Sequence, residues 1–365
     1  MPKLNFLDTY TLMAINEEVV STPTFFADRY FPTGAGDIFA SDKVLTEYRK
    51  GDRKMAAFVA PRVGDIAVGR RGYEIHEYMP AFIAPSRSLT ADELNKRGFG
   101  EALYSNDTAE QRAIRLLIED QQDLENRIRR REEWMAVQTM INNACTMQEY
   151  VDANTVGEVH TIKFYDTVSD HVYVVANPWN SGADKEGKEN YSFIDSDVTA
   201  MCRMLSRRGL KAADLIVGTD VAAAITSNDR ILTLLDKNSG VLTGEIQKEL
   251  TKYDGVVLIG TINFGGFRLN IISADETYED DNGVTQSYFP ATSAMVTAPG
   301  CGRFMYGQIT QMDFGSVDFT THVARRVPKF VADQNTEFRK IRLATRPLAA
   351  PNNYCPYIYA ANVVS

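Results

Sequence analysis

The chain has 365 residues, of which 44% are hydrophobic and 24% are charged, and its formal net charge is −9. This composition is ordinary for a folded protein and excludes disorder throughout the chain. The 48 acidic residues outnumber the 39 basic residues. That balance argues against a dedicated nucleic-acid-binding protein, because such proteins neutralise phosphates with an excess of Lys and Arg.

Targeting and redox signals are weak. The first 20 residues lack a basic region followed by an unbroken apolar stretch, so we expect no signal peptide. No run of about 18 apolar residues occurs, so we expect no membrane-spanning helix. The four cysteines are far apart and form no CxxC pair, which favours buried, reduced thiols in a cytoplasmic compartment; they are Cys145, Cys202, Cys301 and Cys355.

The N-terminal segment combines a helical pattern with an aromatic stretch. Residues 7–20 have helical spacing, and Pro23 ends the pattern. The irregular stretch 23–39 that follows carries five aromatic side chains, which are Phe25, Phe26, Tyr30, Phe31 and Phe39. Aromatic side chains need a surface to cover, and we expect a neighbouring subunit to provide it.

Extended structure follows this segment. Residues 43–60 are typical of a strand, a turn and a second strand. Residues 62–90 favour a long two-stranded excursion, since Pro80 and Pro85 forbid a long helix there. Gly69 and Gly72 flank Arg70 and Arg71 within this excursion.

The clearest predicted helix covers residues 107–143. Asp107 is a good N-cap, and Glu110 completes a capping box three residues later. One narrow apolar stripe follows at helical spacing, formed by Ile114, Leu117, Leu124, Ile128 and Met135. The predicted length of roughly 50–55 Å far exceeds that of an average helix and suits an elongated subunit.

The opposite face of this helix is rich in charge. The spacing predicts i,i+4 ion pairs, namely Asp123–Arg127, Glu125–Arg129 and Arg129–Glu133. The basic run 127–131 is interleaved with Glu125, Glu132 and Glu133, which favours a solvated, self-paired face. Contact with nucleic acid or with an acidic patch of a partner is the alternative.

The second half of the chain alternates short helices and strands. Residues 158–179 carry two strand-like stretches, and 181–190 form a polar loop. Asp197 is expected to cap a helix that ends at Gly209, and Asp220 to open a second helix. Strands are predicted at 213–217, 256–259, 267–274, 293–297 and 303–310, and the last two are expected to continue the same sheet. A hairpin turn is predicted at 281–283, and the C-terminal part has strand character.

Catalytic and ligand-binding patterns receive little support. The four histidines, His76, His160, His171 and His322, have no zinc-site spacing. Gly300 and Gly265 belong to tight turns rather than phosphate loops. The acidic tip formed by Glu276, Glu279, Asp280 and Asp281 lacks the calcium-loop pattern, and a solvated turn is favoured over a Ca²⁺ site. We therefore predict no catalytic, cofactor-binding or metal-binding residue.

The order of these segments resembles a known family. The matching stretches are TYTLMAINEEVV, PTFFADRYFP, the segment from DKVLTEYRKG to MPAFIAP, the long Glu/Arg-rich helix, the segment from GVVLIGTINF to SAMVTAP with the following RFMYGQI, and the C-terminal VPKF to YIYAANVV. Together they resemble the lambda-like phage major capsid protein family, also called phage capsid protein E. The resemblance covers nearly the whole chain and is least clear between residues 145 and 195.

The resemblance implies an α+β fold of the Hong Kong ninety-seven-type phage capsid class. That fold has an N-arm, an extended loop, a peripheral domain with a long spine helix, and an axial domain. Carried onto this sequence, residues 1–45 are the N-terminal helix and arm, 46–61 are peripheral strands, and 62–100 are the extended loop. Residues 101–194 form the peripheral domain with spine helix 107–143, residues 195–315 form the axial domain, and residues 316–365 return to the peripheral domain.

The implied function is that of a major capsid protein of a tailed bacteriophage. Copies of the chain would assemble in the host cytoplasm into hexamers and pentamers of an icosahedral virion shell around double-stranded DNA. The implied partners are other copies of the chain, a portal protein, a scaffolding protein and a decoration protein, with weak non-specific DNA contact and no membrane. The predicted inter-subunit residues are Phe25, Phe26, Tyr30, Phe31, Arg70, Arg71, Tyr73 and Tyr78. An encapsulin-like compartment and an α+β enzyme with an unrecognised site are the alternatives.

Overall fold

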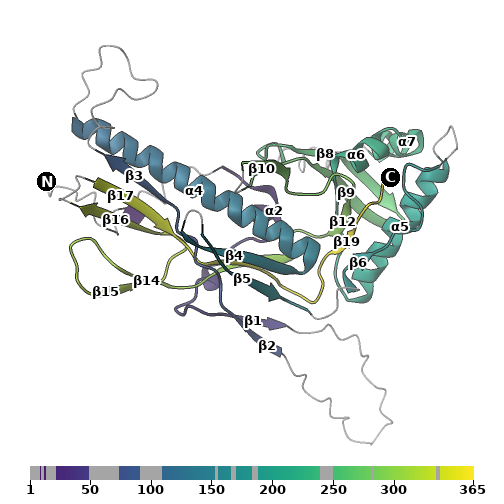
Figure 1. The fold of residues 1–365 in the computed structure, drawn as a ribbon. Coiled ribbons are helices and arrows are strands. Elements are labelled where there is room, and N and C mark those ends of the chain that lie inside the picture. Colours follow the sequence, from purple (N-terminus) through teal and green to yellow (C-terminus); the bar gives the residue numbers. More distant parts are fainter. Residues whose placement is uncertain are drawn as a thin grey trace, which may run out of the picture.

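The computed structural model describes residues 9, 12–13, 22–48, 74–90, 109–152, 155–165, 170–182, 188–238, 250–280, 283–333 and 338–365. A long helix runs along one part of the molecule over several small sheets, and a six-stranded sheet with its own helices forms the other part (Figure 1). The predicted segments 49–73 and 91–108, and most of helix 7–20, lie outside the described residues.

The long helix, α4 (Ala109–Asn142), confirms the strongest helix prediction. Its 34 residues correspond to about 50 Å of helix. Leu124, Ile128 and Met135 of the predicted stripe are buried, so this part of the stripe faces the core. Ile114, near the N-terminal end of α4, is 36% exposed. The first part of the stripe is therefore less covered by the rest of the subunit than the later part.

Small sheets lie against α4. The strands β16 (Val327–Asp333), β17 (Phe338–Ala344) and β3 (Ser86–Thr90) form an antiparallel three-stranded sheet. The strands β13 (Gly302–Tyr306) and β18 (Pro347–Pro351) form a second sheet, and α4 contacts both β17 and β18. The predicted strand 303–310 is therefore corrected: it is divided at Gly307, and its first part joins this separate sheet.

Three two-stranded ribbons extend this layer. The chain leaves α4 directly into β4 (Ala144–Asp152), which pairs with β5 (Thr155–Lys163). Strand β1 (Val44–Tyr48) pairs with β2 (Glu74–Tyr78), across a long interval of sequence. Strand β14 (Ile309–Met312) pairs with β15 (Phe319–His322) in a short hairpin.

The six-stranded sheet has the strand order β6-β19-β12-β7-β9-β8. Its strands are β6 (Val172–Tyr173), β7 (Asp214–Val217), β8 (Val256–Phe264), β9 (Phe267–Ala274), β12 (Ala294–Thr297) and β19 (Ile358–Ala360). The pairs β7–β9 and β6–β19 are parallel, and the other pairs are antiparallel. The predicted strands at 213–217, 256–259, 267–274 and 293–297 are confirmed.

Three helices, α5 (Lys188–Arg207), α6 (Thr219–Thr226) and α7 (Asp229–Asn238), pack on this sheet. The end of α5 at Gly209 is confirmed, since this residue has φ +83° and the Leu210 N–H donates to the Leu205 carbonyl at 3.0 Å. The predicted N-cap role of Asp197 is wrong. Asp197 lies in the middle of α5, where its carboxylate accepts hydrogen bonds from Trp179 Nε1 and the Tyr173 hydroxyl.

The turns between strands follow the sequence signals. Gly265 and Gly266 connect β8 to β9 with φ of +52° and +89°, values that residues with a Cβ rarely adopt. Gly283 follows β10 (Thr277–Glu279) and precedes β11 (Thr285–Ser287) in the predicted acidic hairpin, and Gly300 also has positive φ. Gly265, Gly266 and Gly300 therefore lie in turns, as predicted.

Candidate functional site

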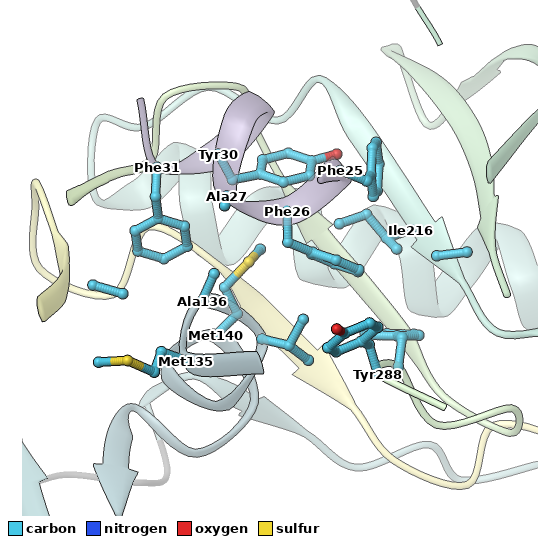
Figure 2. Packing of buried hydrophobic residues seen from close by; sticks show 14 of the residues in the cluster. Phe25, Phe26, Ala27, Tyr30, Phe31, Met135, Ala136, Met140, Ile216 and Tyr288 are labelled. Atoms are coloured by element: carbon cyan, nitrogen blue, oxygen red, sulfur yellow. The ribbon is translucent and has the colours of Figure 1, made fainter. Parts of the chain in front are cut away.

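The N-terminal aromatic segment packs onto its own subunit. Residues Phe25–Tyr30 form the short helix α2, and the 3-10 turn η1 (Ala35–Asp37) follows it. Phe25, Phe26, Tyr30 and Phe31 are at most 1% exposed. Figure 2 shows Phe26 of α2, and Phe31 directly after α2, lying towards the face of α4 that carries Ala136 and Met140. The expectation that these aromatic side chains lack a surface within one subunit is wrong, because α4 and the six-stranded sheet supply it.

We call the set of contacts around α2 the arm junction, because α2 is held there by both parts of the molecule. Glu133 of α4 accepts the Phe26 N–H at 2.5 Å and the Ala27 N–H at 2.7 Å. Arg129 of α4 forms an ion pair with Asp28 at 2.6 Å. The first turn of α2 is therefore fixed to the long helix by side chains that the sequence pattern assigned to solvent.

Asp214 fixes the other side of α2 to the six-stranded sheet. Its side chain is fully buried at the start of β7 and accepts hydrogen bonds from Arg29 Nε at 2.9 Å and the Tyr30 hydroxyl at 3.0 Å. Asn270 of β9 donates to the second carboxylate oxygen at 2.9 Å. Burial and the neighbouring Asp214 raise the pKa of the Tyr30 hydroxyl well above its ordinary value, so this hydroxyl stays a hydrogen-bond donor.

The charged face of α4 is also partly buried, which corrects the prediction of a solvated, self-paired surface. Glu125, Arg129, Glu132 and Glu133 are at most 7% exposed. Of the predicted i,i+4 pairs, Asp123–Arg127 is present at 3.0 Å, whereas Glu125 pairs with Arg326 at 2.7 Å and Arg129 with Asp28. Buried charges must be paired, and here the partners come from segments distant in sequence.

Arg326 is the centre of a buried ionic cluster, made of Arg326, Arg325, Glu125, Glu132, Tyr306 and Thr345. Its guanidinium bonds both oxygens of Glu132 at 2.9 Å. Burial alone would raise the pKa of Glu132, but the charges of Arg326 and Arg325 outweigh it and lower the pKa to about 2. The cluster joins α4 to the segment that precedes β16.

The glycine at the start of β13 leaves space for the arm. A Cβ on Gly302 would lie 2.2 Å from Phe31 Cε1 and 2.8 Å from the Ala350 carbonyl oxygen. We expect Gly302→Ala to lower the free energy of unfolding by about 1–3 kcal/mol, because the Phe31 ring must move within a packed core. Urea denaturation measures this change. Gly36→Ala is the control, since a Cβ there meets nothing within 4 Å; equal effects of the two substitutions would contradict this account.

The remaining predicted inter-subunit residues are only partly described. Tyr78 is half-buried, with its hydroxyl 3.4 Å from the Lys163 carbonyl and its ring against Phe164. Arg70, Arg71 and Tyr73 lie outside the described residues. The structure therefore brings Phe25, Phe26, Tyr30 and Phe31 together in the core, and it places Tyr78 elsewhere, on the β1–β2 ribbon.

The cysteine thiols, the metal-ligating side chains and the long helices of the described part of the chain are the remaining candidates for function. The four cysteines are buried and free, and burial raises the pKa of Cys301 to about 12. Across the described ranges, no group of three His, Cys, Asp or Glu side chains is placed to hold a metal ion. Nor does any helix in those ranges combine the length and apolar character needed to cross a membrane.

The described chain is an α+β subunit in which a long helix lies over small sheets and a buried arm joins this part to a six-stranded sheet. Residues 8–359 match the family model of phage major capsid protein E, so the chain belongs to the phage major capsid protein E family. It is accordingly a structural protein of the virion capsid shell and not an enzyme.

Solved structures agree on the fold. A protein of an Escherichia coli CFT073 prophage, assigned as a capsid protein, is 17% identical with a TM-score of 0.68, and the match covers 98% of this chain and 99% of that one. The capsid of Ralstonia phage GP4 is 8% identical with a TM-score of 0.51, covering 95% and 92%. A phage-related protein from Bordetella bronchiseptica RB50 is 10% identical with a TM-score of 0.50, covering 98% of each chain. The fold is thus the Hong Kong ninety-seven-type capsid fold. No curated protein matches the chain.

Proposed function

We propose that copies of this chain assemble into hexamers and pentamers, and that these tile an icosahedral shell around double-stranded phage DNA. The observation that carries the proposal is the match of one capsid family over residues 8–359. In this proposal residues 101–194 and 316–365 act mainly as the peripheral domain and 195–315 mainly as the axial domain. The exceptions are β6 and β19, which lie in the six-stranded sheet, and β13 and β14, which lie in small sheets outside it. Residues 62–100, as the extended loop, bring Arg70, Arg71, Tyr73 and Tyr78 to a neighbouring subunit.

An exposed apolar hairpin supports self-association. Met312 of β14 and Phe319 of β15 are cross-strand neighbours, 40% and 75% exposed, and Val317 at the turn is 88% exposed. Single exposed apolar side chains are common, but several of them gathered on one ribbon are typical of an interaction surface. We propose that another copy of the chain covers this hairpin in the shell.

Further partners follow from the same proposal. A portal protein, a scaffolding protein and a decoration protein are proposed partners of the assembled shell. The net charge of −9 favours weak, non-specific contact with DNA, since few phosphates would be neutralised by the subunit.

Sedimentation of the purified chain, followed by negative-stain electron microscopy, tests this proposal. We expect rings or closed particles, with DNA and a portal vertex in particles from infected cells. A monodisperse monomer at high concentration, also in the presence of the scaffolding partner, would overturn the proposal. Particles filled with protein cargo would favour an encapsulin-like compartment.

A substitution in the β14–β15 hairpin tests whether this hairpin is a contact between copies of the chain. Phe319→Asp should weaken assembly by at least about tenfold in the concentration required, because one buried charge costs a few kcal/mol at a contact. The circular dichroism of the subunit should be unchanged, since Phe319 is 75% exposed. Val284→Asp is the control for an added surface charge, since Val284 is 55% exposed on another hairpin.

A further inference from the structure

Two arginine side chains flank the exposed ring of Phe82. Phe82 lies shortly before β3, and the next residue, Ile83, exchanges two backbone hydrogen bonds of 2.9 Å with Thr345. This bridge places Phe82 between Arg342 of β17 and Arg346, which follows β17. The guanidinium carbons of Arg342 and Arg346 lie 5.8 and 5.6 Å from the centre of the Phe82 ring. We call these three side chains the arginine platform.

The positive charge of the arginine platform is not compensated within the described part of the subunit. Among the described residues neither Arg342 nor Arg346 forms an ion pair, and the Nε atoms of both are buried without a hydrogen-bond acceptor. Arg342 donates to the neutral amide oxygen of Gln311 at 3.0 Å. Burial lowers the pKa of Arg342. At Arg326 burial acts in the same direction, but the charge of Glu132 helps to outweigh it and the pKa is raised. Arg342 therefore lacks the counter-charge that Arg326 has.

A carboxylate flanked by apolar groups fits the arginine platform. Guanidinium groups bind carboxylate oxygens through paired N–H donors, and they can do so while they lie over an aromatic ring. Phe82 is 45% exposed, so a ligand that also covers its ring has to be partly apolar. The phosphates of nucleic acid bring charge without that apolar cover, whereas a second copy of this chain, with its 48 acidic residues, can bring both. The platform is therefore suited to an acidic segment of a neighbouring copy.

The turn of the β14–β15 hairpin carries such a carboxylate. Asp318 is exposed, and its neighbours in sequence, Val317 and Phe319, are 88% and 75% exposed. The Asp318 N–H donates to Ser316 Oγ at 3.1 Å, which fixes the turn. Within the described residues the Asp318 carboxylate has no hydrogen-bond or ion-pair partner. The hairpin lies at the side of the molecule away from the six-stranded sheet (Figure 1). It therefore presents a free carboxylate between two apolar side chains.

We propose that the β14–β15 turn of one copy docks on the arginine platform of a neighbouring copy, where Asp318 binds the two guanidinium groups and Phe319 covers the Phe82 ring. This inference rests on the proposed self-assembly and names the surface that covers the hairpin. The turn and the platform are different parts of the subunit, so the contact is heterologous. Such a contact passes from copy to copy and closes into a ring where the rotation between copies allows it.

Charge reversal with rescue tests this contact on the full chain. Sedimentation measures the concentration at which assembly begins. We expect Asp318→Arg and Arg346→Glu each to raise that concentration by at least about tenfold, because like charges then face each other across the contact. The chain with both substitutions should assemble within about threefold of the natural concentration, since the reversed charges attract again. Glu279→Arg, at an exposed position of the β10–β11 hairpin, is the matched control and should assemble like the natural chain.

A cross-link decides the matter if Arg346→Glu fails to fold. Asp318→Cys and Phe82→Cys are combined in one chain, both at exposed positions. A short thiol-specific reagent should then join the copies of an assembled particle into a ladder of covalent oligomers. The four natural cysteines are buried and give little background. Arg268→Cys, at an exposed position of β9, replaces Phe82→Cys in the control, which should stay uncross-linked.

The outcomes separate this contact from the proposed function. If the natural chain assembles and Asp318→Arg assembles at the same concentration, the contact is overturned and shell assembly stands. Equal cross-linking in the test and control chains, or a folded double variant without rescue, has the same meaning. Normal assembly of Asp318→Arg with loss of DNA from Arg346→Glu particles would assign the platform to phosphate instead. A natural chain that never assembles overturns the proposed function and the contact together.

Discussion

Arg326→Ala is expected to lower the free energy of unfolding by about 3–5 kcal/mol, because it leaves buried acids without their main counter-charge. The Arg326 side chain is 5% exposed and bonds Glu125 at 2.7 Å and both oxygens of the fully buried Glu132. Urea denaturation at neutral pH measures the loss. Arg127→Ala is the matched control: Arg127 is 59% exposed in its pair with Asp123, and removal of an exposed pair costs about 0.5 kcal/mol or less.

Arg326→Ala should also change how the free energy of unfolding depends on pH. In the natural chain the lowered pKa of Glu132 contributes stability above its ordinary value of 4.5, and that stability is lost as the pH falls towards about 2. Without Arg326 the pKa of Glu132 is lowered less, although Arg325 remains 3.1 Å from it. The variant should therefore lose less stability than the natural chain as the pH falls from about 4.5 towards about 2. A variant that loses under about 1 kcal/mol, or keeps the natural acid profile, would contradict the role given to Arg326.

Asp214→Ala is the second substitution with a large expected effect. It removes the acceptor shared by Arg29, Tyr30 and Asn270 at the arm junction. The Arg29 side chain is 6% exposed, so its charge would remain in the core without Asp214. We expect a loss of about 3–5 kcal/mol in the free energy of unfolding, with the hydrogen-exchange protection of residues 22–39 lowered first.

Asp220→Ala provides the comparison for Asp214. Asp220 is exposed in the first turn of α6, where its interaction with the helix dipole is worth about 1 kcal/mol at most. A comparable loss from both substitutions, or full protection of the arm segment in Asp214→Ala, would show that Asp214 does not hold the arm. Asp214→Asn separates charge from hydrogen bonding, because the amide keeps one acceptor oxygen.

The long helix was predictable because its signal is local. An apolar stripe repeated from Ile114 to Met135 fixes both the element and the side that is buried. The partners of its charges are not local. Arg326 lies about 200 positions from Glu125 in sequence, and spacing along one helix favours the nearer Arg129. The prediction of a solvated face failed for that reason.

The arm junction escaped prediction for a related reason. A six-residue helix after Pro23 has too few turns to show a period, and its aromatic side chains indicate burial without indicating what buries them. One usable signal was present: Asp214 stands in a strand whose other residues are apolar, and such a carboxylate needs a partner. The prediction for Asp197 failed because it relied on residue type alone. Asp is often an N-cap, but Asp197 lies within α5, where it accepts a hydrogen bond from Trp179.

The strand order of the six-stranded sheet has a consequence for biosynthesis. Strand β6 joins the sheet through β19, which is formed only by residues 358–360. A ribosome that has passed β12 has therefore delivered five of the six strands, but β6 has no partner in the sheet until β19 takes its place beside β12. The β6 edge of the sheet can therefore form only after residues 358–360 have been translated, and it is completed after β7, β8, β9 and β12 are available to pair.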